Sequence, residues 1–392
     1  IGIIAPEFPP DVGGIETYAY EFSAELARRG QDVFVFTLAE SECEIEMPGI
    51  KVLPVLSQKY EKDRQLPKIY SMDVWHVMNA GYAWLATETN PVIVSVHGND
   101  FLSPYHLPMR PNLPRLPGLW RVQPQLDPLH SWVWRKASRW LMRRGLSRAR
   151  QVIANSEYTK SLLVRCVPQC GAKTSVGFVG VADEFLQMPR RRCRSDRTKR
   201  LVTVCRLAEP RKNVDKVLQA LAKLKQYRFQ YTVVGDGRLR LGLEALCRQL
   251  GIEDRVSFTG FIPKTEIPCL LASSDLFIMA SGVSSNSVEG FGIAYLEANA
   301  CGTPVLAARA AGAVEAVNEG KTGYFVDEPS IPAITEALER FLTSDITFKS
   351  EECHAFASRF TWPKVVDHAM RYYVSGSRDD KRPSSRTTSA LR

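Results

Sequence analysis

The sequence predicts an α/β protein built from two doubly wound domains with parallel sheets. At 392 residues the chain is too long for one ordinary hydrophobic core, so two domains are expected. Short apolar runs alternate with helical segments through both halves, which is typical of parallel sheets covered by helices. Polar and glycine-rich segments follow many of these runs. In such sheets ligands bind beyond the carboxyl ends of the strands, so these segments are the candidate site.

The first domain is expected to begin with a strand over residues 1–5, a loop over 6–14 and a helix from about 16 to 29. Tyr18 and Leu26 lie on one face of that helix. Further strands are expected at residues 32–37, 91–97, 149–154, 201–204, 231–234, 255–258, 275–279 and 304–307.

Composition divides the chain at residues 188–200, a basic and polar segment without periodicity. We interpret it as a solvated linker, with contact to anionic lipid as the alternative. The domains are then residues 1–187 and 201–355. Residues 356–374 contain a last helix, starting near 362, and residues 375–392, rich in Ser, Arg and Asp, are expected to be a disordered tail.

The bulk composition is that of a soluble globular protein, with 45% hydrophobic and 24% charged residues. A net charge of +9 favours an acidic surface or a phosphate-bearing ligand. No apolar run approaches the ~20 residues that span a bilayer, and no signal peptide is expected. The nine cysteines are scattered without a Cys-x-x-Cys pair, which favours a reduced, cytosolic protein. Since the chain opens inside an apparent strand, its true start is expected a few residues upstream.

Residues 289–297, Glu-Gly-Phe-Gly-Ile-Ala-Tyr-Leu-Glu, form the most informative pattern. Two glycines delay the helix to about Ile293, and Gly302 ends it. Glu289 therefore lies in the loop before the helix and Glu297 one turn inside it. Carboxylates accept hydrogen bonds from hydroxyls, and the unpaired first amides of a helix bind oxyanions, so the pattern suits a ligand with sugar and phosphate. The alternative is that Glu289 only stabilises the helix dipole and Glu297 is a surface residue.

Two other loops have features of phosphate sites. Residues 205–215 follow a strand and open a helix, which places Arg206 and Lys212 near a helix N-terminus. Gly13 and Gly14 come just before the first helix and can bring backbone amides close to an anion. In isolation, such cations are usually solvated and such glycines usually mark a turn.

His97 and Asp100 follow the strand at residues 91–97, where either a structural or a functional role is open. The Gly-Asp-Gly at 235–237 is similar to a dinucleotide-binding fingerprint but lacks its third glycine. We interpret it as a tight turn beside a nucleotide and infer no NAD.

Together these motifs resemble those of the retaining glycosyltransferases of family four, which have the GT-B fold and are typified by bacterial mannosyl- and glucosyltransferases. The resemblance covers nearly the whole chain. It implies two Rossmann-like domains facing across a deep cleft, with the acceptor on the N-terminal domain and the nucleotide sugar on the C-terminal one. The implied reaction moves a hexose from a nucleoside-diphosphate sugar to a hydroxyl of a lipid-linked or oligosaccharide acceptor, in cell-surface polysaccharide or glycolipid synthesis.

The resemblance also implies roles for individual residues. The catalytic set is Glu289 at the sugar hydroxyls, His97 near the C6 hydroxyl, and Arg206 and Lys212 at the leaving diphosphate. The donor-binding positions are Gly13, Gly14, Arg211, Gly235, Gly260, Phe261, Phe291, Gly292, Ile293 and Glu297, the last for the ribose hydroxyls. Asp100 and Asn155 are placed on the acceptor side, although Asp100 has loop orientation as its alternative role.

The chain departs from the family pattern beside the cations. Asn213 stands where the family usually has glycine, and one residue is inserted between the two cations, so Arg211 is an alternative to Lys212.

The expected mechanism is front-face transfer with retention, in which the departing phosphate oxygen helps to deprotonate the acceptor. No carboxylate pair is arranged as acid and nucleophile, as glycoside hydrolases require. Catalysis then depends on positioning and charge stabilisation, and on domain closure that excludes water. No Asp-x-Asp motif follows a strand, so we expect no metal and no cofactor.

Residues 106–150 combine many cations with tryptophans and one acid, Asp127. This mixture suits a membrane surface, which predicts a cytoplasmic protein peripheral to the inner face of the plasma membrane and a lipid-linked acceptor. The alternative is an ordinary helix with Trp132 and Leu146 packed inward. No nucleic-acid-binding module is present. The cations are Arg110, Arg115, Arg121, Arg135, Lys136, Arg139, Arg143, Arg144, Arg148 and Arg150, and the tryptophans are Trp120, Trp132, Trp134 and Trp140.

Two other functions stay open at this stage. One is a related GT-B enzyme, either a sugar-nucleotide epimerase or a phosphorylase, and the other is a carbohydrate- or lipid-binding protein without turnover. The base of the donor stays open between guanine and uracil. Residues 280–288 resemble the loop of mannosyltransferases that act on lipids, so GDP-mannose is the first donor to test.

Overall fold

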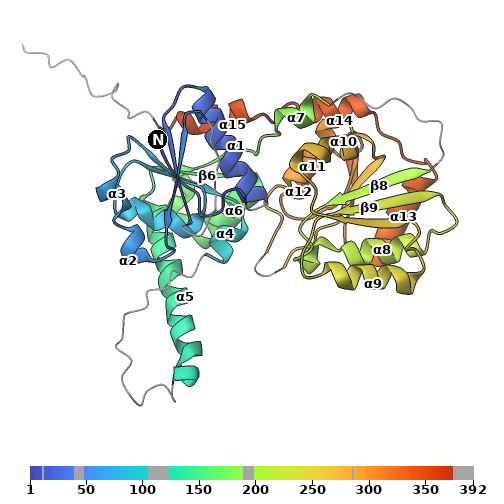
Figure 1. Ribbon diagram of the computed structural model, residues 1–392, viewed down its shortest axis with the longest axis horizontal. Helices are drawn as coiled ribbons and strands as arrows, with labels where there is room; N and C mark the ends of the chain where they lie inside the picture. Colours follow the sequence, from blue (N-terminus) through green and yellow to red (C-terminus); the bar gives the residue numbers. More distant parts are fainter. Residues whose placement is uncertain (11–12, 39–47, 105–122, 189–197, 285–286, 374–392) are drawn as a thin grey trace, which may run out of the picture.

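The computed structural model describes residues 1–10, 13–38, 48–104, 123–188, 198–284 and 287–373, and for residues 123–134 only the backbone. Two parallel sheets form two separate α/β domains, which lie side by side in Figure 1. The prediction of two doubly wound α/β domains is therefore confirmed. The basic segment at 189–197 and the tail at 375–392 lie outside the described residues.

The first sheet has the order β3-β2-β1-β4-β5-β6-β7, and every pairing in it is parallel. Its strands are β1 (Gly2–Ile4), β2 (Val33–Leu38), β3 (Ile50–Leu56), β4 (Trp75–Val77), β5 (Val92–Val96), β6 (Gln151–Ala154) and β7 (Thr174–Val176). The strand order reverses between β1 and β4, so the loops after these strands diverge and leave room for a ligand.

The second sheet repeats this order as β10-β9-β8-β11-β12-β13, again parallel. Its strands are β8 (Lys199–Val204), β9 (Phe229–Val234), β10 (Val256–Gly260), β11 (Leu276–Met279), β12 (Val305–Ala308) and β13 (Gly323–Val326). The reversal here lies between β8 and β11. The loops after these two strands carry the predicted cations and the predicted carboxylate.

The two helices predicted to begin near residues 16 and 293 are present. The first predicted helix is α1 (Gly14–Arg28), and the helix predicted from Ile293 is α11 (Ile293–Ala300). The remaining α-helices are α2 (Tyr60–Asp63), α3 (Leu66–Ile69), α4 (Asn99–Leu102), α5 (Gln123–Arg148), α6 (Glu157–Cys166), α7 (Asp183–Leu186), α8 (Val214–Ala222), α9 (Arg240–Leu250), α10 (Ile267–Ala272), α12 (Ala313–Ala316), α13 (Ile331–Leu342), α14 (Ser350–Ala357) and α15 (Trp362–Met370). The 3₁₀ turns include η1 (Ala80–Thr87), η4 (Pro210–Lys212) and η5 (Lys264–Glu266).

The chain crosses back to the first domain through α15, which packs beside α1 (Figure 1). The Arg29 guanidinium holds this contact by donating to the Asp367 carboxylate and to the Pro363 carbonyl. Helix α15 ends at Met370, so it is shorter than the predicted helix from about residue 362 to 374.

One hydrophobic cluster joins the two domains. It includes Tyr18 and Phe22 of α1, Phe185 of the connecting helix α7, and Tyr295 of α11. Trp362 of the crossing helix belongs to the same cluster. The segments on either side of the domain boundary are thus tied to a common core.

Helix α5 stands on the η1 turn, and its first half projects from the body of the domain (Figure 1). Leu146 and Met142 are buried at its base. Gly145 allows the closest approach, because a Cβ there would lie 2.1 Å from the Ala83 carbonyl oxygen. The docking fixes the direction in which α5 presents its other face.

Replacing Gly145 with alanine tests this docking. Glycine-to-alanine changes inside helices usually stabilise by about 0.5–1 kcal/mol. At Gly145 we expect a loss of about 1–3 kcal/mol instead, because the methyl group overlaps the Ala83 carbonyl. Gly242→Ala in α9 is the matched control, since a Cβ there has no neighbour within 4 Å. Thermal unfolding should show a lower midpoint for the first variant and an unchanged or higher one for the second; a rise in both would contradict the proposed packing.

Candidate active site

Loops from both sheets meet at the domain boundary, and they carry the residues predicted from the sequence. The second domain contributes the segments after β8, β9, β10 and β11. The first domain contributes the segments after β1, β5 and β6. Hydrogen bonds link the two sides at Asn99, Ser156 and Glu315, so the loops are in direct contact.

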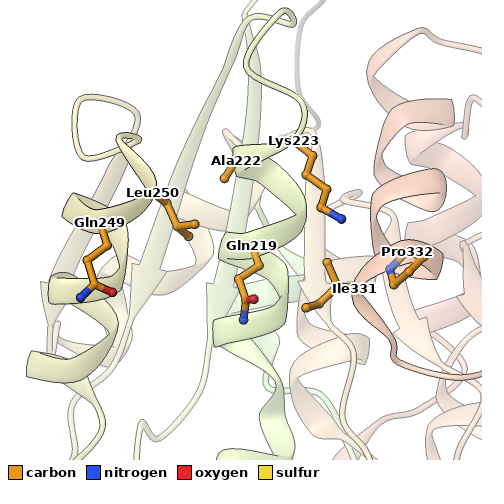
Figure 2. Close-up of a pocket in the computed structure, with 7 residues that line it drawn as sticks. All are labelled: Gln219, Ala222, Lys223, Gln249, Leu250, Ile331 and Pro332. Atoms are coloured by element: carbon orange, nitrogen blue, oxygen red, sulfur yellow. The ribbon is translucent and has the colours of Figure 1, made fainter.

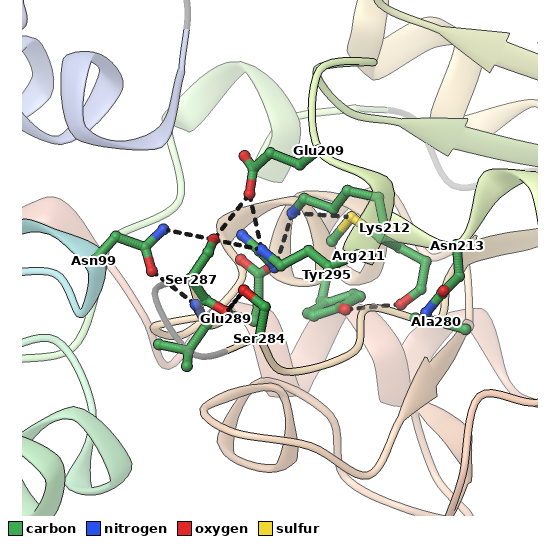
Figure 3. Close-up of polar contacts among 12 residues, drawn as sticks. Asn99, Glu209, Arg211, Lys212, Asn213, Ala280, Ser284, Ser287, Glu289 and Tyr295 are labelled. Carbon is green, nitrogen blue, oxygen red and sulfur yellow. Dashed lines mark hydrogen bonds and ion pairs between the residues drawn. The ribbon is translucent and has the colours of Figure 1, made fainter. Parts of the chain in front are cut away.

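Glu289 lies at the centre of a network of charges, shown in Figure 3. Its Oε2 atom accepts a hydrogen bond from Lys212 Nζ at 2.6 Å and another from the Arg211 guanidinium at 3.3 Å. Arg211 also pairs with Glu209 at 2.8 Å. Both cations of the η4 turn therefore reach Glu289.

The Glu289 carboxylate is ionised because of these cations. Burial by itself raises its pKa, but Lys212 and Arg211 outweigh this effect and hold the pKa below its ordinary value. The side chains are 14%, 12% and 9% exposed for Glu289, Lys212 and Arg211, so solvent screens their attraction little. The site keeps a charged hydrogen-bond acceptor with two cations beside it.

Asn213 makes the turn that directs these cations. Its φ of 55° lies in the left-handed region, which glycine and asparagine adopt most readily. Its side chain also donates to the Ala280 carbonyl at 2.6 Å, which ties the η4 turn to the end of β11. Asn213 thus adopts the left-handed conformation at the position where the family usually has glycine.

Arg206 lies apart from the Glu289 network. Its side chain is 58% exposed, and its guanidinium lies 3.7 Å from the Glu16 carboxylate of α1. Glu16 is buried and covers Gly13, where a Cβ would lie 2.4 Å from that carboxylate. The Gly13–Gly14 loop therefore carries an acid beside its helix N-terminus, which the sequence analysis did not single out.

The segment after Glu289 is held by close backbone contacts. Gly292 has a φ of 93°, and no side chain in the described part of the chain caps the N-terminus of α11. A Cβ on Gly290 would lie 2.1 Å from the His97 carbonyl oxygen, and a Cβ on Gly312 would lie 1.9 Å from the Gly290 carbonyl oxygen. These glycines let three loops approach closely, which leaves the first amides of α11 available for an anion.

The aromatic ring of Phe291 points away from solvent. It is buried and packs against Phe178 of the first domain and Phe360 of the crossing segment, with ring centroids 5.6 and 5.7 Å apart. Only its backbone is then suited to contact a ligand.

Asp100 orients the loop after β5. One carboxylate oxygen accepts from the His97 amide at 3.0 Å and the other from the Ala80 amide at 2.9 Å. Of its two expected roles, this geometry matches loop orientation.

His97 is buried, and its Nε2 has no hydrogen-bond partner among the described residues. Burial lowers its pKa despite the opposing effect of Asp100, so the ring is neutral near pH 7. Tyr18 packs edge-on against the ring at 4.6 Å. A neutral imidazole with one unused nitrogen is suited to a hydroxyl group.

Helix α6 joins the domains through its first turn. The Ser156 hydroxyl donates to the Gly290 carbonyl at 2.6 Å, and Thr159 donates to the same oxygen at 3.2 Å. In return, the Glu315 carboxylate accepts two amides at the α6 N-terminus. Asn155 precedes this turn, and its Oδ1 atom is buried without a partner in the described structure.

Glu297 belongs to a second group of charges. Lys264 donates to Glu21 of α1 at 2.6 Å and lies 3.3 Å from Glu184 of α7. Burial raises the pKa of the half-buried Glu297 to about 7; Lys264 opposes this effect, and Glu184 and Glu21 add to it. The second carboxylate of the 289–297 pattern therefore titrates near neutral pH, whereas the first does not.

The turns after β9 and β10 lie against each other. The Gly235 amide donates to the Gly260 carbonyl at 2.9 Å, and a Cβ on Gly235 would lie 2.0 Å from the Cys205 carbonyl oxygen. Phe261 follows with 62% of its side chain exposed. The glycines at 235 and 237 thus permit close backbone packing, in agreement with their interpretation as a tight turn.

Other features of the described residues lie outside this network. No group of three His, Cys, Asp or Glu side chains suited to a metal ion occurs in the described part. Among the helices described, none is long and apolar enough to cross a membrane. A surface hollow of about 590 Å³ between α8, α9 and α13 contains none of the predicted site residues (Figure 2). It is lined by Gln219, Ala222, Lys223, Gln249, Leu250, Ile331 and Pro332.

Two family models match the chain. The family described as glycosyltransferase family 4 matches residues 12–181, and the family described as glycosyl transferases group 1 matches residues 190–359.

Curated relatives match along most of the chain. A GDP-mannose-dependent alpha-(1-6)-phosphatidylinositol monomannoside mannosyltransferase of Mycolicibacterium smegmatis is 29% identical and covers 86% of this chain and 87% of its own. A D-inositol 3-phosphate glycosyltransferase of Gordonia bronchialis is 27% identical, and the match covers 93% of this chain and 84% of that protein. Among solved structures, sucrose-phosphate synthase from Thermosynechococcus elongatus aligns with a TM-score of 0.74 at 18% identity, over 95% of this chain and 97% of its own. That likeness supports the fold alone.

Replacing Lys212 with methionine tests the charge network. An unpaired buried charge costs about 3–5 kcal/mol, but Arg211 stays beside Glu289, so we expect a loss of about 2 kcal/mol and a higher pKa for Glu289. Lys349→Met is the control, because its pair with Glu352 is exposed and is worth at most about 1 kcal/mol. Urea unfolding at pH 7 measures both; equal effects would show that the Glu289 pair is no stronger than a surface pair.

Proposed function

We propose that this chain, which belongs to glycosyltransferase family four and has the GT-B fold, moves a hexose with retention from a nucleoside-diphosphate sugar to an acceptor hydroxyl. The membership follows from the two family models and the curated relatives. The observation that carries the proposal is the ionised Glu289 with Lys212 and Arg211 beside it, at the boundary of two doubly wound domains. This arrangement offers an acceptor for sugar hydroxyls next to cations for a diphosphate.

The cations are suited to stabilise the leaving diphosphate. When the sugar–phosphate bond breaks, negative charge develops on the diphosphate, and positive groups placed there lower the barrier. Lys212, Arg211 and the exposed Arg206 supply that charge from the chain itself, which supports transfer without a metal ion. The first amides of α11 are the expected partners of the distal phosphate.

The two carboxylates are proposed to bind different parts of the donor, the hexose and the ribose. Glu289 is proposed to accept hydrogen bonds from the hexose hydroxyls, with the unpartnered Nε2 of His97 at the C6 hydroxyl. Glu297 is proposed to accept from the ribose hydroxyls. The acceptor would approach from the first domain, past Asn155 and the loop that Asp100 orients. The departing phosphate oxygen then takes the proton of the acceptor hydroxyl on the same face of the sugar.

The donor and acceptor are proposed from the relatives. GDP-mannose is the first donor to test, because the mycobacterial relative is described as GDP-mannose-dependent. That relative and the inositol phosphate relative are named for inositol-containing acceptors, which favours a lipid-linked or phosphorylated polyol over a free oligosaccharide.

Helix α5 supports contact with an anionic membrane. Its solvent face carries cations with one tryptophan among them, and no acidic residue occurs between residues 135 and 150. Trp140 is 56% exposed, with the Arg144 guanidinium 5.1 Å from its ring centre. We propose that the protein acts on the cytoplasmic face of the membrane through this surface. The exposed cations are Arg135, Lys136, Arg139, Arg143, Arg144 and Arg148; Trp120, Trp132 and Trp134 lie outside the described side chains.

Donor binding tests the proposed function. Isothermal titration with GDP-, UDP-, dTDP- and ADP-sugars, all with EDTA present, should give binding with one nucleotide class. Between pH 6 and 8 the affinity should rise, because Glu297 with its pKa of about 7 becomes ionised and a carboxylate is the better acceptor for ribose hydroxyls. Glu289 stays ionised over this range because Lys212 and Arg211 hold its pKa below the ordinary value, and burial lowers the pKa of His97 as well.

Glu297→Gln supplies the control for this pH dependence. It should bind about tenfold more weakly than the wild type at pH 8 and show no rise with pH. No binding of any nucleotide sugar to the folded protein, or the same pH dependence in the variant, would contradict the assignment.

Vesicle sedimentation tests the membrane surface. Each cation near an anionic bilayer contributes about 1 kcal/mol, so reversing Arg139 and Arg143 to glutamate should weaken binding to phosphatidylglycerol vesicles at least about thirtyfold at low salt. Reversing Lys223 and Arg248, exposed on the second domain, changes net charge equally and should have a much smaller effect. Equal losses from both pairs would show that net charge, and not the α5 face, governs binding.

A further inference from the structure

Asn99 of the first domain holds the loop that carries Glu289 in the second. It is the first residue of α4 and directly follows Gly98, which lies two residues after the end of β5. Its Oδ1 atom accepts from the Val288 amide at 2.7 Å, and its Nδ2 atom donates to the Ser287 hydroxyl at 3.2 Å (Figure 3). The Asn99 side chain thus bonds to both Ser287 and Val288, the two residues just before Glu289.

The Ser287 hydroxyl has its full set of hydrogen bonds. It accepts from Asn99 and from Arg211 Nε at 2.7 Å, and it donates to Glu209 at 3.1 Å. A hydroxyl has two acceptor positions and one donor, so this arrangement leaves no freedom for another rotamer. Arg211 in turn donates to Glu289, and the chain of contacts runs from the first domain to the catalytic carboxylate.

The first domain also holds the other side of Glu289. The Gly290 carbonyl accepts from Ser156 and Thr159 of α6, while the Val288 amide donates to Asn99. Both neighbours of Glu289 in the chain are therefore bonded to the first domain. In an open arrangement of the two domains these bonds would be lost together, and only Lys212 and Arg211 would orient the carboxylate.

We infer that Asn99 is a positioning residue that fixes the 287–288 segment beside Glu289 only while the two domains are in contact, with Ser287 as the residue that links it to Arg211. This inference rests on the proposed function and goes beyond it, because it names the residues by which closure is transmitted to the reacting centre. The donor nucleotide can bind to the second domain before closure. Its hexose is then oriented for transfer only after Asn99 reaches the 287–288 backbone, which limits loss of the donor to water.

We expect the loss of Asn99 to reduce turnover while donor binding is kept. Asn99→Ala should lower kcat about ten- to hundredfold, which corresponds to the loss of one or two hydrogen bonds in the closed state. The dissociation constant of the donor without acceptor should change less than about twofold, since the bonds form only on closure. Ser287→Ala should lower kcat as well, but its bonds to Arg211 and Glu209 lie within the second domain and do not need closure, so the test of unchanged donor affinity applies to Asn99→Ala alone. A residue with only a structural role would lower stability and affect both quantities.

The double variant Asn99→Ala/Ser287→Ala shows whether the two residues act through one path. Residues in one hydrogen-bonded chain are coupled, so the double variant should lose about as much kcat as the worse single variant. Ser103→Ala, exposed at the end of the same short helix, is the matched control and should keep wild-type kcat.

The outcomes separate the inference from the proposed function. A wild-type kcat in Asn99→Ala, a parallel loss of donor affinity, or losses that multiply in the double variant would each overturn the inference while the transferase assignment stands. A folded wild-type protein that binds no sugar nucleotide and transfers no hexose would overturn the proposed function, and the inference with it.

Discussion

The ion pair between Glu289 and Lys212, reinforced by Arg211, is the interaction on which the rest of the site depends. A carboxylate at a largely buried position would take up a proton at higher pH than usual if it stood alone, and the two cations reverse that tendency. The site therefore keeps a negative acceptor and a positive pair within hydrogen-bonding distance. A nucleotide sugar presents the complementary pattern, with hydroxyls on the hexose and negative charge on the diphosphate. The second carboxylate, Glu297, has Lys264 as its neighbouring cation among the described residues and shares it with Glu184 and Glu21, so its charge depends on pH.

The fold brings these groups together because both sheets have the same strand order. In each sheet the order reverses beside the first strand, so the loops after β1 and β8 lie at corresponding places and face the domain boundary. Contact there is close only because Gly98, Gly290 and Gly312 carry no side chains. Ser156 and Asn99 then bond to the backbone on either side of Glu289. The geometry of the Glu289 carboxylate is thus a property of both domains.

Local chemistry explains what the sequence could predict. The strand and helix pattern, the start of α11 after two glycines and the cations after β8 all follow from neighbouring residues. Strands β3, β4, β7 and β13 were not predicted. Strand β3 contains Pro54 with much of its length exposed, β4 and β7 have only three residues each, and β13 has four residues and begins at a glycine. Asn99 and Val288 are 189 residues apart, and no local pattern connects them. Glu16 and Glu315 were missed as site residues for the same reason, because their partners lie in the other domain.

A crystal structure with an intact nucleotide sugar would test the central claim most directly. The account predicts that Lys212 Nζ and the Arg206 guanidinium lie within about 3.2 Å of diphosphate oxygens. It also predicts the Glu289 carboxylate at the hexose hydroxyls and Glu297 at the ribose. A nucleotide bound elsewhere, or bound here with its diphosphate away from both cations and its sugar away from Glu289, would contradict the account.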